Sequence, residues 1–180
     1  GKTDWKHLKA ALTSFKTEGD FIDLDIDFFE YEDIDMGESE LEKMCRKYSL
    51  LPQTHKIIFI FDRDVPKHLK TMGNGSNFKN WGNNVFSFCI PIHSHRSHYK
   101  NISIELFYTE DDLKTLDSGG KRLFFTNEIK ASKTIHTDLT TNKTEIVENY
   151  IRLETPMIIN EFAKKIYDQD ASKIVDSSGN

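Results

Sequence analysis

The chain has 180 residues, 37% of them apolar and 29% charged, and its net charge at pH 7 is −5. This composition is typical of a soluble, folded domain, and no apolar run approaches the roughly 18 residues of a membrane span. Proteins that bind nucleic acid through a broad electrostatic field are usually basic, so this chain would need a local basic patch, a metal ion or a partner.

The first third of the chain alternates between helical and strand patterns. Residues 3–17 have apolar residues at helical spacing, and residues 21–32 alternate apolar residues with aspartates, as a half-buried strand does. A second helical stripe covers residues 41–48, before the unbroken apolar run Ile57–Phe61. Such a run fits a strand covered on both faces, as in a parallel sheet. The order helix, strand, helix, strand predicts an α/β fold with right-handed crossovers.

The remainder of the chain is more polar. It predicts a Gly/Asn-rich loop over 72–84, strands over 84–92 and 102–108, and the start of a helix over 110–115. A polar β-hairpin insertion is expected over 117–153. The last predicted element is a helix over 154–169, with Thr155 as N-cap and Pro156 at its first position. The two cysteines, Cys45 and Cys89, lie in apolar-periodic segments, which indicates buried free thiols and a reducing cytoplasm. We expect residues 1–180 to form a single domain.

Two carboxylates, Asp62 and Asp64, follow the apolar strand directly. Ligands of open α/β sheets bind beyond the carboxyl ends of the strands, and residues two apart in an extended chain point the same way. Because like charges this close repel, a cation would stabilise both in their ionised form. Mg²⁺ or Mn²⁺ is the expected cation, since hard divalent ions take oxygen ligands. A purely structural alternative has Asp64 capping the next turn and Asp62 solvated.

The sequence around these aspartates favours one family over another. Haloacid-dehalogenase-type phosphatases also place two aspartates after a strand, but they need a distal GDxxxD-like motif, and this sequence contains no convincing copy. The opening GKTDWKHLKAAL, with FIFDRD at residues 59–64, resembles the Toprim domain over about residues 1–115. Within that family, the pattern looks like that of the Toprim nucleases of the OLD (overcoming-lysogeny-defect) type and of related phage-defence systems.

The resemblance implies a sheet with parallel central strands flanked by helices, and metal-dependent phosphodiester cleavage. Asp62 and Asp64 match the family's Asp-x-Asp metal ligands, and Asp4 matches an acid that assists metal binding. Gly1 matches a glycine that follows the family's glutamate. That glutamate and its strand would precede Gly1, so we expect this polypeptide to cleave DNA and RNA poorly and a version extended upstream to cleave.

Several further residues are candidates for the site or for partner binding. Glu105 would complete a second metal position or lie on a solvated sheet face, and Lys2 and Arg96 would contact phosphate. Zinc binding by the HSHRSH loop, residues 93–98, is a weaker possibility than a solvated polar loop. Positive charge on the insertion could hold a nucleic-acid backbone or simply aid solubility: Lys121, Arg122, Lys130 and Lys133.

Two functions follow from these observations. The first is a cytoplasmic, divalent-metal-dependent nuclease acting in phage defence, with DNA favoured over RNA as substrate and no membrane association. The second is a catalytically silent Toprim module that binds nucleic acid or an ATPase partner. The sequence contains no Walker-type GxxxxGK[ST] motif, so the ATPase would lie elsewhere.

Overall fold

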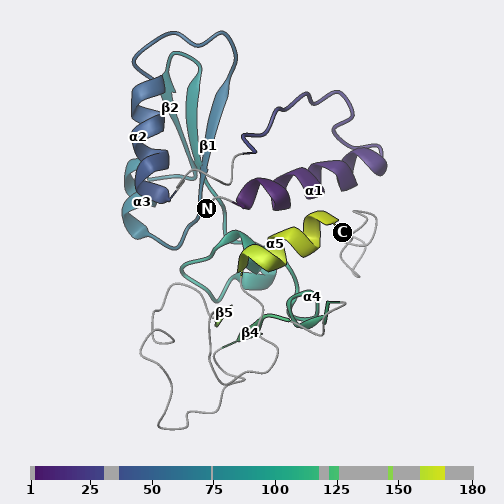
Figure 1. Cartoon of the computed structure of the whole chain (residues 1–180). Coiled ribbons are helices and arrows are strands. Elements are labelled where there is room, and N and C mark those ends of the chain that lie inside the picture. The colour runs from purple at the N-terminus through teal and green to yellow at the C-terminus, as the bar shows by residue number, and fades with distance from the viewer. Residues whose placement is uncertain are drawn as a thin grey trace. The chain divides into compact units, whose positions relative to one another are not determined.

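The computed structural model describes residues 3–30, 37–73, 75–117, 122–125, 146–147 and 159–168. These residues fold as two compact units (Figure 1). The first unit contains the described residues from 37 to 107, and the second contains those before 31 and after 107. Within the described ranges, no helix combines the length and the apolarity that a membrane crossing requires.

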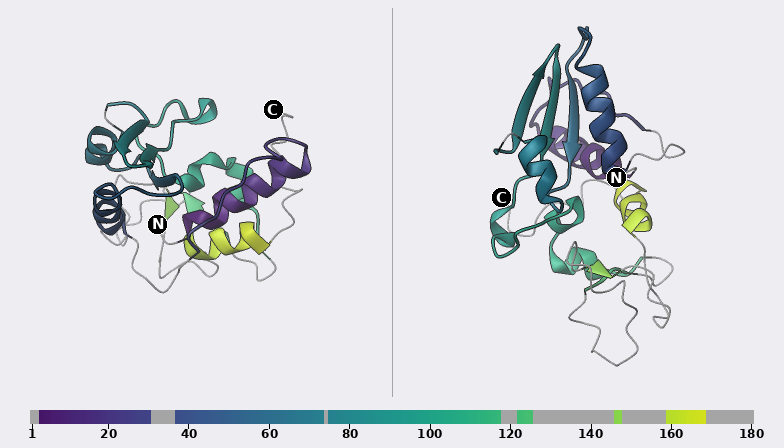
Figure 2. Two further views of the ribbon diagram at one scale, coloured as in Figure 1. Left: turned by 90° about the horizontal axis from the view of Figure 1, so that it is seen from above. Right: turned by 90° about the vertical axis from the view of Figure 1, so that its left-hand side faces the viewer.

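A three-stranded mixed sheet organises the first unit, and two further views of it are given in Figure 2. Its strands lie in the order β1 (Ile57–Phe61), β3 (Val85–Cys89), β2 (Phe78–Gly82). The pair β1–β3 is parallel and the pair β2–β3 is antiparallel. The unit is therefore α/β, and the predicted strands at Ile57–Phe61 and within 84–92 are confirmed.

Strand β2 lies in the stretch that the sequence predicts to be loop, so that prediction is wrong. The cause is a two-residue hairpin turn of Asn83 and Asn84, whose φ angles are 52° and 62°. Such turns need positive φ at both positions, which asparagine tolerates better than most residues. The two side-chain amides also donate hydrogen bonds of 2.8 Å to the carbonyls of Ser49 and Gln53. Residues typical of a loop thus make a hairpin.

One face of the sheet forms the core of this unit. Helices α2 (Glu38–Tyr48) and α3 (Pro66–Thr71) supply side chains to it, and its buried members are Cys45, Phe59, Phe61, Met72, Val85 and Cys89. Both cysteines are free and buried, as the sequence predicts. Burial raises the pKa of the Cys45 thiol to about 11. The thiol is therefore protonated at neutral pH and is a weak nucleophile.

The opposite face of the sheet is apolar and partly exposed. The strand register places five apolar side chains together on this face: Ile58, Ile60, Phe78, Phe86 and Phe88. Ile58 is 57% exposed and Phe78 is 51% exposed. The prediction that Ile57–Phe61 is covered on both faces is therefore wrong for the described residues. An apolar strand sequence predicts burial, but it does not show which part of the protein would cover the second face of the sheet.

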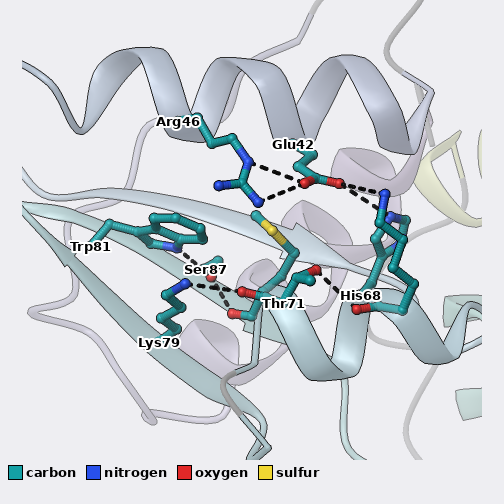
Figure 3. A network of polar contacts seen from close by, with 9 residues as sticks. Glu42, Arg46, His68, Thr71, Lys79, Trp81 and Ser87 are labelled. Atoms are coloured by element: carbon teal, nitrogen blue, oxygen red, sulfur yellow. Dashed lines mark hydrogen bonds and ion pairs between the residues drawn. The ribbon is translucent and has the colours of Figure 1, made fainter.

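A network of polar contacts connects the helices to the hairpin (Figure 3). Glu42 accepts two hydrogen bonds from the Arg46 guanidinium and lies 3.7 Å from Lys67 Nζ and 3.9 Å from His68 Nε2. The hydrogen bond from Arg46 is the main reason why the pKa of Glu42 is lowered. Arg46 also lies 5.1 Å from the centre of the Trp81 ring. Since Arg46 is half exposed, this network orients the elements more than it stabilises them.

We expect Gly73→Ala to destabilise the protein by about 2 kcal/mol, because a methyl group at this position overpacks the site. A Cβ on Gly73 would lie 2.1 Å from the carbonyl oxygen of Ser76 and 2.9 Å from that of Leu69, both of them backbone atoms. Urea denaturation would measure the loss. The control is Gly75→Asn: Gly75 has a φ of 78°, and a Cβ there would lie within 4 Å of no heavy atom outside Gly75 and its two chain neighbours, so asparagine should cost much less.

The second unit is built around two helices, α1 (Asp4–Thr17) and α5 (Ile159–Asp168). They pack through Ala10, Phe162, Ala163 and Ile166, and the rings of Trp5 and Tyr167 meet edge to face at 5.2 Å. The unit also holds α4 (Glu110–Lys114), capped by Thr109, and an antiparallel pair of short strands, β4 (Phe124–Phe125) and β5 (Ile146–Val147). The predicted helices at 3–17, 110–115 and 154–169 are confirmed in their described parts; Thr155 and Pro156 lie outside the described residues.

His7 on α1 is the buried histidine of this unit. Its side chain is 3% exposed, and Nδ1 lies 2.8 Å from the Tyr108 hydroxyl. Its ring also packs against that of Phe162 at a centroid distance of 5.9 Å. Burial lowers the pKa of His7 to about 4. The imidazole is therefore neutral in the folded protein at physiological pH.

The strand predicted over residues 21–32 is not formed in its described part, residues 21–30. Ile22 is 65% exposed and Leu24 is 42% exposed, so the alternating apolar face is not buried. A period-two pattern defines two faces, but a strand also needs a partner with which to pair its backbone. The three aspartates of the alternation are exposed as well: Asp23, Asp25 and Asp27.

Candidate functional site

The chain from Asp62 to Asp64 is fixed at the carboxyl end of β1 by contacts with a distant segment. The Arg63 amide donates to the Ile102 carbonyl at 2.9 Å, and the Ile104 amide donates to Asp62 Oδ1 at 3.0 Å. The hydrogen bond from the Ile104 amide orients the Asp62 carboxylate. Arg63 turns toward Asn77, to which its Nη1 donates at 2.7 Å. Asp62 and Asp64 therefore lie where the sequence predicts, directly after the strand.

Three buried side-chain atoms in these segments have no hydrogen-bond partner among the described residues. Two are oxygen atoms: Oδ1 of Asp64, a residue that is half-buried as a whole, and Oγ of Ser103, a residue that is 4% exposed. The third is Nε of Arg63. Leaving a buried polar group unsatisfied typically costs about 1–3 kcal/mol, and more for a charged group. Unsatisfied atoms of this kind in native proteins call for an explanation such as a bound ion or water.

Glu105 and Arg96 are also buried, but in a different setting from the predicted one. Residues Ile104–Phe107 form the 3₁₀ turn η2, not a strand, and Glu105 within it is 3% exposed. The solvated-face alternative for Glu105 is therefore wrong. Arg96 ends the 3₁₀ turn η1 (Ser94–Arg96), is 4% exposed, and donates from Nε to the Leu106 carbonyl at 3.1 Å. The solvated-loop reading is wrong for this arginine.

Hydrogen bonds thus connect three segments of the first unit at the end of β1. The segments are the Asp62–Asp64 stretch, the chain from Ser103 into η2, and η1, which is joined to η2 through Arg96 and Leu106. A carboxylate and a hydroxyl oxygen are hard ligands of the kind that Mg²⁺ and Mn²⁺ take. In the described ranges, no group of three or more His, Cys, Asp or Glu side chains is arranged to hold a metal ion.

Other predicted site residues are placed elsewhere or lie outside the description. Asp4 is half-buried in the first turn of α1, which belongs to the second unit, while Lys2 lies outside the described residues. His93 and His95 are exposed and their Nδ1 atoms face each other. Arg122 donates to the Leu123 carbonyl. The other insertion cations also lie outside the described residues: Lys121, Lys130 and Lys133.

Ser103 is the site residue that sequence reasoning missed. It stands between Ile102 and Ile104, where an alternating strand pattern assigns it to a polar, solvated face. Its burial follows from the turn into η2, because the amides and carbonyls around it bond to the Asp62 segment and not to a strand. A serine flanked by apolar residues close after a carboxylate-bearing strand is too common a pattern to identify a site by itself.

Comparison with protein-family models, with curated proteins and with solved structures finds no match for this chain.

Proposed function

We propose that this chain is a Toprim-like, divalent-metal-dependent nuclease module that hydrolyses phosphodiester bonds, acting in the cytoplasm in phage defence, with DNA as the favoured substrate. The observation that carries the proposal is the buried, unpartnered Oδ1 of Asp64, two residues after Asp62 at the end of β1. A cation at this position would complete the coordination of a carboxylate oxygen that the described residues leave unsatisfied.

The end of β1 carries oxygen atoms of the kind that such an ion takes. Asp62 and Asp64 would hold it, and Glu105, which is buried on η2, is the acid that we propose for a second position. The Ile104 amide would hold the Asp62 carboxylate in a fixed orientation. When bound, Mg²⁺ or Mn²⁺ would activate water and neutralise charge on the phosphate. The sequence resemblance adds Asp4 as an assisting acid, and this role stays a prediction.

The test is a comparison of thermal unfolding in millimolar Mn²⁺ and in chelator. A metal that binds only the folded state at ten times its Kd adds about 1.4 kcal/mol, or a rise in Tm of about 4 °C. Asp64→Asn should abolish that rise and raise the Tm in chelator, because it removes a carboxylate whose buried Oδ1 has no hydrogen-bond partner among the described residues. The matched control is Asp25→Asn, which removes an exposed aspartate and should leave the metal-dependent rise unchanged.

Cleavage is then measured on plasmid and single-stranded substrates with Mg²⁺ and Mn²⁺. Activity that is present in a version extended upstream, and lost from it in Asp62→Asn and Asp64→Asn, supports the nuclease. A metal-dependent rise in Tm without cleavage of any substrate by the parent chain or by the extended version would favour the catalytically silent binding module instead. The absence of any metal-dependent change in the parent would contradict the site itself.

A further inference from the structure

We propose that Ser103 belongs to this site and that its hydroxyl oxygen is a ligand of the cation held by Asp62 and Asp64. The inference rests on the proposed function, since it assigns a further ligand to the same ion. Serine and threonine hydroxyls act as Mg²⁺ ligands elsewhere, as in phosphate-binding loops. The argument comes from the placement of Ser103, its burial and the state of its hydroxyl.

The placement of Ser103 follows from the hydrogen bonds of its two neighbours. Ile102 accepts from the Arg63 amide at 2.9 Å, and Ile104 donates to Asp62 Oδ1 at 3.0 Å. Consecutive Cα atoms lie about 3.8 Å apart, so Ser103 is held within one residue of both contacts. Its backbone therefore runs directly beside the Asp62–Asp64 stretch.

The hydroxyl of Ser103 contrasts with the other deeply buried serine of the unit. Ser87 is 0% exposed, and its hydroxyl donates to the Met72 carbonyl and accepts from Trp81 Nε1 at 2.8 Å (Figure 3). Ser103 is almost as deeply buried, but its Oγ has no hydrogen-bond partner among the described residues. The Ser87 hydroxyl is thus hydrogen-bonded to groups of the protein itself, whereas the Ser103 hydroxyl can bind a partner from outside the described residues.

The nature of that partner is argued from the second unsatisfied oxygen atom, since the remaining unsatisfied atom of these segments, Arg63 Nε, belongs to a guanidinium that donates to Asn77. Asp64 Oδ1 is buried and unpartnered as well, so the hydroxyl and the carboxylate do not satisfy each other. Both are oxygen atoms with lone pairs, and a cation can accept from both at once. A hard ion is favoured over a soft one, because each of these ligands is oxygen. The Ser103 hydroxyl would bind as a neutral ligand, beside the charged carboxylates.

The experiment replaces this oxygen by sulfur and changes the metal to match. Ser103→Cys should bind Cd²⁺ at least tenfold more tightly than the parent chain and show the ultraviolet charge-transfer absorption of a cadmium–thiolate bond. Adding Asp64→Asn to this variant should remove the absorption. Ser97→Cys, which puts a thiol on the exposed loop after η1, is the matched control and should behave as the parent does. The parent's Cys45 and Cys89 set the background.

A second arm keeps the proposal testable if the cysteine variant fails to fold. In Mn²⁺ titrations of the parent chain, Ser103→Ala should weaken binding about tenfold, whereas Ser103→Thr, which keeps the hydroxyl, should bind within about threefold of the parent. Unchanged Mn²⁺ affinity in Ser103→Ala, with binding still lost in Asp64→Asn, would overturn the role of Ser103 and leave the proposed metal site standing. Failure of the parent to bind Mn²⁺ would overturn both.

Discussion

Phe61→Ala is expected to lower the free energy of unfolding by about 4 kcal/mol, the range found when a large aromatic core residue is truncated. Phe61 is the last residue of β1 and is 1% exposed. Its ring packs at 5.4 Å from that of His68 and belongs to the core cluster between the sheet and the two helices. Removing it leaves a cavity that rigid neighbours on three elements cannot fill. Urea denaturation measures the loss.

The matched control for this prediction is Ile58→Ala on the same strand. Ile58 is 57% exposed and points to the opposite face, so its truncation should cost less than about 1 kcal/mol. The comparison separates burial from strand propensity, because both changes remove a β-favouring residue from β1. Equal losses for the two variants would mean that the sheet face carrying Ile58 is covered in solution.

Acid is expected to destabilise the second unit through His7. Its folded-state pKa of about 4 lies below the ordinary value of 6.5, so folding favours the neutral imidazole. The stabilisation is present in full above pH 6.5 and is lost as the pH falls from about 6.5 to about 4. A difference of this size corresponds to about 3 kcal/mol. Denaturation followed between pH 7.5 and 4 measures the slope.

His7→Asn isolates this contribution from the carboxylates that also titrate in acid. The asparagine amide can keep the contact that His7 Nδ1 makes with the Tyr108 hydroxyl, and it does not titrate. The variant should be less stable at pH 7.5 because it fills less space, but its stability should fall less steeply with acid. His55→Asn, at an exposed position, should retain the parent's slope. Parallel profiles for the parent and His7→Asn would contradict the assignment.

Periodicity predicted the presence of these elements better than it predicted which side chains they bury. The helix at residues 41–48 and the strand Ile57–Phe61 place Cys45, Phe59 and Phe61 in the core of the first unit. The helix at residues 3–17 forms as predicted, but its buried residues are Lys6, His7 and Ala10, and Phe15 of its apolar stripe is 44% exposed. The segment 102–108 alternates in the same way, yet it forms η2, because its backbone bonds to Arg63 and to the Asp62 carboxylate. Which partner the backbone of a segment bonds to depends on tertiary structure, so the apolar periodicity of the sequence does not reveal it.

The candidate site was predictable only in its local part. Asp62 and Asp64 are adjacent to a strong strand signal, so their place at its carboxyl end follows from the sequence. The burial of Ser103 and Arg96 depends on the packing of 3₁₀ turns, which carry weak sequence signals because they are short. Residue type at these positions gives little guidance, since serine and arginine are usually exposed.

The strand pairing also has a consequence for the order in which this unit assembles. Residues of β2 and β3 that pair are close in sequence and joined by a two-residue turn, whereas β1 reaches β3 only through a crossover that contains α3 and β2. Closing a short loop loses less entropy and is faster than closing a long one. We therefore expect the hairpin to form early and β1 to dock late. The carboxylates that follow β1 would then gain their fixed positions in the last steps of folding, so a partly folded chain would contain the hairpin but not the site.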